Sequence, residues 1–442
     1  MRQIDILASS QNIVFSPVLQ QPPEVKRRYF CYLNKMIRLA KWNRRKYTKA
    51  QLVYYKSILC TDAESICRDT TLSMPEKLCY LIPFDIVSIA GFQKKVISAD
   101  KVSMIIQKMT DSFAMSAEQR DFLHEEFSAA LGSRKAWDNV MRDRRMREFG
   151  GYLSLVRKNI FFIKRWPYSI LLTATMSAGK STLINVLVGK NVSLMQNMAC
   201  TSKIHFIVSK PFEDGMTSEY DHDIAIDAEQ ADLLSDNEEN LSSKITVGTY
   251  FNSSLCGKRL ILLDSPGVNS SENAEHCAIS NEMIRSGKYK LLIYVMNATQ
   301  LATHDEFVHL GNVKKSIGQV NIIFVLNKID ELLYEDEKIP EVLNHVEQFL
   351  KENGFKNPII CPVSARAAYL AQKSQRETIS RLECQQLEDF MDLFEQSNME
   401  DYYKTLPGCL ELTNGKNKVD NLLKNCGIAY LEQIIDYFKG RL

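Results

Sequence analysis

Six short apolar runs in the latter part of the chain constrain its fold more than any other feature. They read SILLTAT, KIHFIVS, RLILLD, KLLIYVMN, NIIFVLN and PIICPVS, and segments long enough to form helices separate most of them. Continuous apolar strands that alternate with helical segments are typical of a mainly parallel sheet covered by helices on both faces. We therefore predict an α/β domain of this kind over residues 168–442.

The part of the chain that precedes this domain has a helical pattern. Apolar side chains recur there at spacings of three and four, as at Tyr29 and Leu33. Ser116 and Gln119 have the spacing of a capping box at the start of a helix. We predict a flexible lead-in over residues 1–24, an all-α N-terminal domain over residues 25–131, and basic linker or neck helices over residues 132–167.

The bulk composition excludes several classes of protein. The chain has 442 residues and a formal net charge of +2, so its total charge predicts no affinity for nucleic acid or membranes. Its 11 cysteines include no C-x-x-C pair, which indicates reduced thiols rather than a disulfide framework. The apolar runs are shorter than the roughly 20 residues that a membrane-spanning helix needs. We expect a cytoplasmic protein, peripheral at a membrane if a local charge cluster binds one.

Two stretches are strongly charged. Residues 26–49 hold ten lysines and arginines and no acid, with five aromatic residues between them. These residues could form a solvated helix face, or bind a membrane surface or an acidic protein; a nucleic-acid backbone is the least favoured partner. Residues 213–240 are acidic, which is typical of a solvated surface insertion.

The first apolar run leads directly into TATMSAGKST, residues 173–182, and a helical pattern follows. This is the context of a phosphate-binding loop, although Ala174 stands where G-x-x-x-x-G-K-[ST] begins with glycine. Lys180 would reach the β- and γ-phosphates, and the Ser181 hydroxyl would bind Mg²⁺. The backbone N–H groups that would face phosphate oxygens are those of Ser177, Ala178, Gly179, Lys180, Ser181 and Thr182. The alternative is an ordinary turn between a strand and a helix.

Three further motifs end apolar runs in the order that a guanine-nucleotide site requires. In LILLDSPGVN, Asp264 would hold Mg²⁺ through water and Gly267 would offer its N–H to the γ-phosphate, although this composition also suits a plain turn. In FVLNKIDE, the carboxylate of Asp330 would accept two N–H groups of guanine that adenine lacks. The other base-motif residues are Asn327, which ties the loop or contacts the base edge, Lys328 along the base, Ser364, and Ala365, whose N–H would meet guanine O6. Together these motifs predict binding of GTP rather than ATP.

The chain resembles the dynamin superfamily, particularly its bacterial branch, over roughly residues 165–442. The resemblance rests on the Ser-Ala-Gly-Lys-Ser order of the phosphate loop, on NATQLATHDE at residues 297–306, and on the closing LLKNCGIAYLEQIIDYF. It implies that Thr201 is the mobile-loop threonine that closes on Mg²⁺ and the γ-phosphate. The flanks of Thr201 depart from the dynamin pattern, so a plain strand-edge threonine is the alternative. No C-terminal stalk is recognised, which puts membrane fission in doubt.

The same resemblance carries expectations about turnover. Val268 and Asn269 follow Gly267, so the water-orienting glutamine of many small GTPases is absent there. Met176 stands where relatives often have another glutamine, whereas Ser177 could assist the bridging β–γ oxygen. We expect slow basal GTP hydrolysis that rises when two GTPase domains associate. The alternative is a nucleotide-gated regulatory module with little or no hydrolysis.

Overall fold

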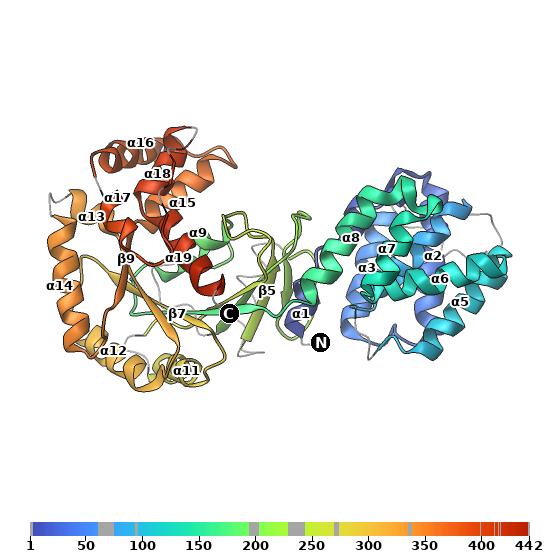
Figure 1. Cartoon of the computed structure of the whole chain (residues 1–442), viewed down its shortest axis with the longest axis horizontal. Helices are drawn as coiled ribbons and strands as arrows, with labels where there is room; N and C mark the ends of the chain where they lie inside the picture. The colour runs from blue at the N-terminus through green and yellow to red at the C-terminus, as the bar shows by residue number, and fades with distance from the viewer. Residues whose placement is uncertain are drawn as a thin grey trace. The chain divides into compact units, whose positions relative to one another are not determined.

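The computed structural model describes residues 3–60, 75–92, 96–193, 203–228, 244–268, 274–334, 338–397, 399–410, 412–413, 415 and 417–440. It divides into two compact units (Figure 1). The first comprises Met1–Trp166, Lys210–Ala228 and Gly248–Tyr250. The second comprises Pro167–Ser209, Glu229–Val247 and Phe251–Leu442.

The first unit is built mainly from helices. Its elements are α1 (Gln3–Leu7), η1 (Asn12–Phe15), η2 (Pro17–Gln20), α2 (Pro23–Leu39), α3 (Lys46–Leu59), η3 (Glu76–Leu81), α4 (Ile82–Ile89), α5 (Ala99–Phe113), α6 (Ala117–Ala130), α7 (Arg134–Arg142), η4 (Arg144–Phe149) and α8 (Gly150–Ile163), with the short strands β3 (Ser218–Tyr220) and β4 (Ile224–Ala225). Ser116 and Gln119 form the predicted capping box at the start of α6. The core includes Trp42 and Trp137, both about fully buried.

A carboxylate lies at the centre of this helical core. Asp85 of α4 is fully buried and accepts hydrogen bonds from the hydroxyls of Tyr29 at 2.5 Å, Tyr152 at 3.0 Å and Tyr55 at 3.2 Å. Burial raises the pKa of Asp85 to about 6, and the three tyrosine hydroxyls partly offset that rise. The network joins α2, α3, α4 and α8, so these four helices share one polar centre.

Two of the predicted domain assignments are wrong in the first unit. The lead-in expected to be flexible contains α1, η1 and η2, and its residues Leu7 to Ile13 are buried. The helices expected to be a linker or neck belong to the core, because Trp137, Val140 and Leu153 are fully buried in it. Apolar residues of these helices pack inward, whereas Arg134, Arg144 and Arg147 are exposed.

The two charged stretches also differ from expectation. All five aromatic residues of the basic stretch are buried, namely Tyr29, Phe30, Tyr32, Trp42 and Tyr47, so they are core residues and not part of a binding surface. In the acidic stretch, Asp214 is buried against Lys210 at 3.0 Å and accepts the N–H of Gln11 at 2.6 Å. This part of the acidic stretch is therefore a packed segment of the first unit, not a solvated insertion.

The second unit contains the predicted α/β domain. Its elements are β1 (Tyr168–Ala174), α9 (Lys180–Val188), β2 (Ile204–Ser209), β5 (Lys244–Thr249), β6 (Leu260–Asp264), α11 (Ala274–Arg285), β7 (Leu291–Asn297), α12 (His304–Ser316), β8 (Asn321–Asn327), α13 (Ile329–Tyr334), α14 (Ile339–Glu352), β9 (Ile359–Val363), α15 (Ala365–Ser374), α16 (Arg381–Gln396), α17 (Glu400–Lys404), α18 (Lys418–Asn425) and α19 (Ile428–Gly440). All six predicted apolar runs coincide with strands, β1, β2, β6, β7, β8 and β9.

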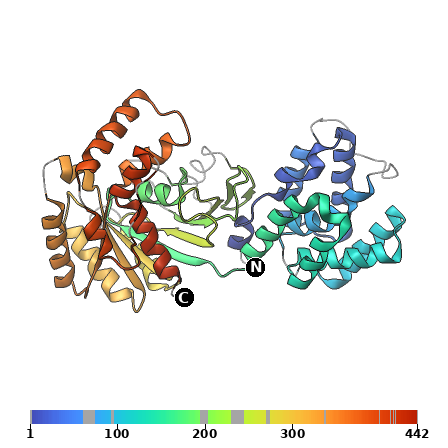
Figure 2. The same cartoon turned by 45° about the horizontal axis from the view of Figure 1, so that its top comes forward.

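The nine described strands form one mainly parallel sheet in the order β4-β3-β5-β2-β6-β1-β7-β8-β9. β1 pairs in parallel with β6 and β7, and β7, β8 and β9 continue in parallel, whereas β2 runs antiparallel to β6. Helices of the second unit cover both faces, as Figures 1 and 2 show. Every residue of β7 is buried, as expected for a strand covered on both faces.

Candidate functional site

The four sequence motifs meet because β1, β6, β8 and β9 are parallel. Asp264 at the end of β6 is in register with Leu172, two residues before the end of β1. Asn327 at the end of β8 is in register with Asn297 of β7 and Val363 of β9. Ligands of open α/β sheets bind at the carboxyl ends of the strands, and this edge of the sheet is where all four motifs lie.

The first position of the phosphate-loop motif, where glycine is usual, lies in a strand. Ala174 ends β1 in register with Val295, is fully buried, and accepts the N–H of Val268 at 3.1 Å. Its φ is not positive, so this position needs no glycine. The left-handed backbone lies further along the loop, at Ser177 (φ 61°) and Gly179 (φ 84°). Ser177 is exposed, whereas Ala178 is buried.

Lys180 begins α9 and is buried against the predicted metal-site carboxylate. Its Nζ forms an ion pair with Asp264, which is fully buried. Ser181 and Thr182 follow in the first turn of α9 and are half-buried. Asp264 also accepts a hydrogen bond from the Ser193 hydroxyl at 3.3 Å. The start of α9 and the end of β6 are thereby joined through charged side chains.

Two residues outside the predicted motifs, Asn185 and Ser193, support this arrangement. Asn185 of α9 is buried, and its side chain accepts the N–H groups of Val192 at 2.9 Å and Ser193 at 2.8 Å and donates to the Ser193 carbonyl at 2.8 Å. It therefore fixes the segment that carries the Ser193 hydroxyl to Asp264. A single asparagine within the apolar run LINVLV is the signal that could have identified it.

Asn327 joins the phosphate loop to the fourth motif. Its Nδ2 donates to the Ala178 carbonyl at 2.8 Å, and its Oδ1 accepts the N–H of Ala365 at 3.0 Å. Gly179 allows this close approach, since a Cβ at that position would lie 2.2 Å from Asn327 Nδ2. The amide thus ties the loop together, which is the first of the two roles considered for it.

The remaining base-motif residues surround the start of α13 and α15. Asp330 is buried, its Oδ1 has no hydrogen-bond partner among the described residues, and burial raises its pKa. Ser364 is fully buried and caps α15 by accepting the N–H of Ala367 at 3.1 Å. Lys328 has a positive φ of 69° and pairs with Glu331 at 3.4 Å.

The second motif packs against the phosphate loop. Met176 donates its N–H to the Val268 carbonyl at 3.2 Å, and Gly267 lies beside the Met176 side chain, which a Cβ on the glycine would approach to 3.4 Å. Thr201 lies outside the described residues. The predicted site residues that the structure describes therefore gather at one edge, and the predicted switch threonine stays a prediction.

A polar cluster joins β1 to helices α11 and α12 next to this site. The Thr173 hydroxyl, one residue before the loop, is 2.9 Å from His309 Nε2 of α12 and 3.3 Å from the Ser280 hydroxyl of α11. Burial lowers the pKa of His309 to about 4, so its imidazole is neutral. Glu306, one turn earlier in α12, accepts the N–H of Ala302 at 3.0 Å, and burial raises its pKa to about 7.

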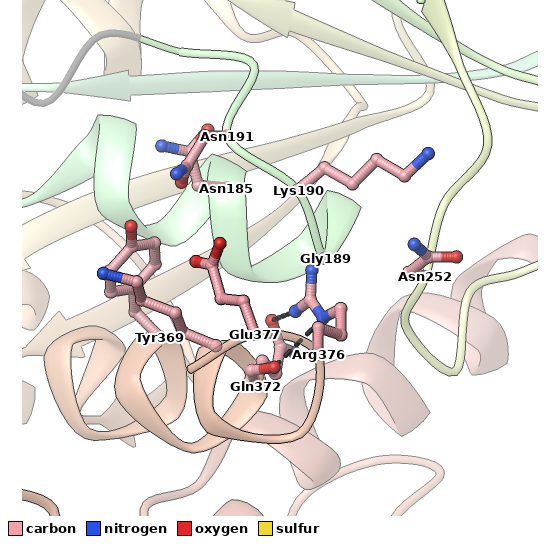
Figure 3. A pocket seen from close by; sticks show the side chains of 10 residues that line it. Asn185, Gly189, Lys190, Asn191, Asn252, Tyr369, Gln372, Arg376 and Glu377 are labelled. Carbon is pink, nitrogen blue, oxygen red and sulfur yellow. Dashed lines mark hydrogen bonds between the residues drawn. The ribbon is translucent and has the colours of Figure 1, made fainter. Parts of the chain in front are cut away.

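A pocket of about 240 Å³ opens at the opposite end of α9 (Figure 3). Asn185, Gly189 and Lys190 border it on one side, and Gln372 and Arg376 of the α15 region border it on the other. The pocket therefore lies away from the phosphate loop, at the carboxyl ends of two helices whose amino ends carry predicted nucleotide residues. Cations at helix carboxyl ends offset the helix dipole, and their presence here needs no ligand.

No helix among the described residues is long and apolar enough to pass through a membrane. No group of three or more His, Cys, Asp or Glu residues among them could hold a metal ion.

Comparison with known proteins shows which family part of the second unit is similar to. The model of the dynamin family matches residues 170–329, which include the phosphate loop, Asp264 and Asn327. Over these residues the chain is similar to the dynamin family. A probable transmembrane GTPase FZO-like, chloroplastic, from Arabidopsis thaliana is 25% identical over 222 residues, covering 49% of this chain and 21% of that protein. A bacterial dynamin-like protein from Nostoc punctiforme is 23% identical over 253 residues, covering 52% of this chain and 35% of that protein.

The chain thus spans about a fifth to a third of the length of these curated relatives. Among solved structures, one of an oligomerised bacterial dynamin pair is 15% identical with a TM-score of 0.38, covering 97% of this chain and 62% of that chain. Aquifex aeolicus Era bound to GDP·AlF4⁻ is 18% identical with a TM-score of 0.27, covering 45% of this chain and 50% of that chain.

Proposed function

We propose that the second unit binds GTP with Mg²⁺ and hydrolyses it to GDP and phosphate by in-line attack of water. The observation that carries the proposal is the bridge made by Asn327 between the phosphate loop and the fourth motif. This bridge connects the predicted phosphate-binding and base-binding segments through one buried amide. A dynamin-family domain over the same residues supports the same function.

The carboxylate of Asp330 fits a guanine base. A buried carboxylate oxygen without a partner costs free energy, and a base N–H would supply the missing hydrogen bond. Guanine N1 and N2 both carry N–H groups, whereas adenine has no such pair. Asp330 is therefore the residue that we propose selects GTP over ATP.

The residues near Asp264 fit a hard cation. Ser181 offers a hydroxyl oxygen and Asp264 offers carboxylate oxygens, and oxygen is the ligand type that Mg²⁺ prefers. When bound, Mg²⁺ neutralises charge on the β- and γ-phosphate oxygens. Thr201 stays the proposed third ligand. Lys180, held near this position by Asp264, would contact the phosphates.

We expect low basal turnover. The thioether of Met176 beside Gly267 cannot orient water, so the chain lacks a glutamine at both expected positions. We propose that association of two GTPase domains compensates for this, and that the nucleotide state is relayed to the helical unit or to a partner protein. The exposed cations of the basic stretch are the proposed contact for a membrane or an acidic protein, and the proposed location is cytoplasmic.

GTP hydrolysis by the full chain over a range of protein concentrations tests the proposal, with Lys180→Ala as the inactive control. Specific activity should rise with concentration, and the variant should be inactive. Tight GTP binding with turnover no faster than that of the variant would instead favour the nucleotide-gated module. Equal competition by ATP would contradict the role given to Asp330.

A further inference from the structure

A groove of about 500 Å³ lies on the first unit, in the part formed by residues 132–165. It lies where the amino end of α7 and the carboxyl end of α8 come together. The residues that line it are Gly132, Arg134, Arg157, Phe161, Lys164 and Arg165. Every charged residue in this lining is a cation, in contrast to the mixed charges around the pocket of Figure 3.

The cations of the groove are arranged around one aromatic ring. Arg134 and Arg157 each lie 5.8 Å from the centre of the Phe161 ring, and Lys164 lies 6.0 Å from it. Contact with the ring holds the cationic groups close together without a carboxylate between them. Arg157 has one acidic neighbour, Asp138 at 3.5 Å, and both side chains are about half exposed, so this ion pair is weak.

The backbone at the edge of the groove is shaped around Lys164. The Lys164 Nζ donates to the carbonyls of Leu131 at 2.7 Å and Gly132 at 3.0 Å, which directly follow α6. Gly132 has a φ of 83°, and a Cβ there would lie 1.8 Å from Lys164 Nζ. The left-handed backbone at this position favours glycine, and the two carbonyls hold one cation at the edge of the groove.

The arginines indicate the chemistry of the ligand. A guanidinium presents a planar fork of N–H donors that matches two oxygens of a phosphate group, and three of the four lining cations are arginines. The amino end of α7, a helix of nine residues, adds the positive end of a helix dipole beside Arg134. Shape, charge and donor geometry all favour a compact polyanion.

We propose that this groove binds a ligand that carries two or more phosphate groups. The proposal concerns the helical unit and does not depend on the nucleotide site. The phosphates could belong to a soluble molecule or to the headgroups of lipids, and the chemistry that recognises them is the same. Each of these sources requires the arginines of the groove.

Isothermal titration of the full chain with inorganic triphosphate tests the proposal. The buffer contains saturating GDP and no Mg²⁺, so that the nucleotide site and metal complexes do not contribute. The groove variant is Arg134→Gln/Arg157→Gln. Its matched control is Arg144→Gln/Arg147→Gln, which removes two exposed arginines of the same unit at the other ends of α7 and α8. The groove variant should bind at least about tenfold more weakly, and the control should match the wild type within about twofold.

A second arm measures co-sedimentation with phosphatidylcholine vesicles that contain phosphatidic acid. If triphosphate does not bind but these vesicles do, and only the groove variant loses binding, the phosphates are those of lipid headgroups. If neither probe binds, or if both double variants lose binding equally, the proposal is wrong. Fluorescence of the buried Trp42 and Trp137 verifies that the variants fold. Should the double variant unfold, Arg165→Gln replaces it, with the same expected loss.

Discussion

Replacing Asn327 with alanine should loosen the phosphate loop and lower the stability of the second unit. The change removes the donor to the Ala178 carbonyl and the acceptor for the Ala365 N–H, at 2.8 and 3.0 Å. Each group would be left buried without its partner, at a cost of about 1–3 kcal/mol apiece. We therefore expect the free energy of unfolding to fall by about 2–6 kcal/mol.

The chain provides an internal control for this measurement. All three tryptophans, Trp42, Trp137 and Trp166, lie in the first unit, so urea unfolding followed by their fluorescence reports that unit. Far-UV circular dichroism reports both units. Asn327→Ala should shift the dichroism transition and leave the fluorescence transition in place. Asn321→Ala, at the exposed start of the same strand, is the matched variant and should shift neither.

A shift of less than about 0.5 kcal/mol between Asn327→Ala and Asn321→Ala would refute the reasoning. It would mean that water or a rearranged loop satisfies the two backbone groups. Weakened GTP binding without a loss of stability would show that the amide acts on the ligand rather than on the loop. The two outcomes separate a role of Asn327 in tying the loop from a role at the edge of the base.

Three other changes should have measurable effects. Gly179→Ala would place a Cβ 2.2 Å from Asn327 Nδ2 at a residue whose φ is 84°. It should weaken GTP binding at least about tenfold in a fluorescent-nucleotide titration. The control Gly257→Ala, also at positive φ but in open space, should leave GTP binding unchanged. Asp85 has a raised pKa of about 6, so its folded form binds a proton more tightly than the unfolded chain, and stability falls as pH rises from about 4 to about 6. Asp85→Asn should remove up to about 3 kcal/mol of this pH-dependent loss of unfolding free energy. Unfolding followed by tryptophan fluorescence at several pH values measures it, and an unchanged pH profile would contradict the prediction. Thr173→Val should destabilise the second unit by about 1–2 kcal/mol in chemical unfolding, because it removes the hydroxyl that contacts His309; no change would mean that the contact contributes nothing.

The sequence predicted the second unit well because its strands carry a strong local signal. The run NIIFVLN coincides with β8 from Asn321 to Asn327, and the other five runs coincide with strands to within a residue or two. Strands buried on both faces are continuously apolar, so their sequence pattern identifies them without knowledge of the neighbouring strands. β5 was missed because KITVGT is short, polar at alternate positions and interrupted by Gly248.

The organisation of the first unit could not be predicted, because distant segments determine it. The Ser10 hydroxyl donates to the Phe212 carbonyl at 2.7 Å, and Gln11 donates to Asp214, so residues about 200 positions apart share one packed region. No local pattern reports such a pairing. The lead-in was therefore predicted to be flexible from its polar composition, although its polar groups are buried and hydrogen-bonded.

The missing glycine at Ala174 illustrates which features of a motif the backbone enforces. At the first position of the loop, β1 continues in extended conformation, and a bridge between Thr175 and Val268 extends the parallel pairing beyond it. A methyl group fits there because the strand needs no positive φ. Gly179, in contrast, combines positive φ with contact to Asn327, so both of its constraints exclude a side chain. Selection should therefore tolerate alanine at the start of this loop and not at Gly179, and Ala174→Gly should leave GTP binding unchanged while Gly179→Ala weakens it.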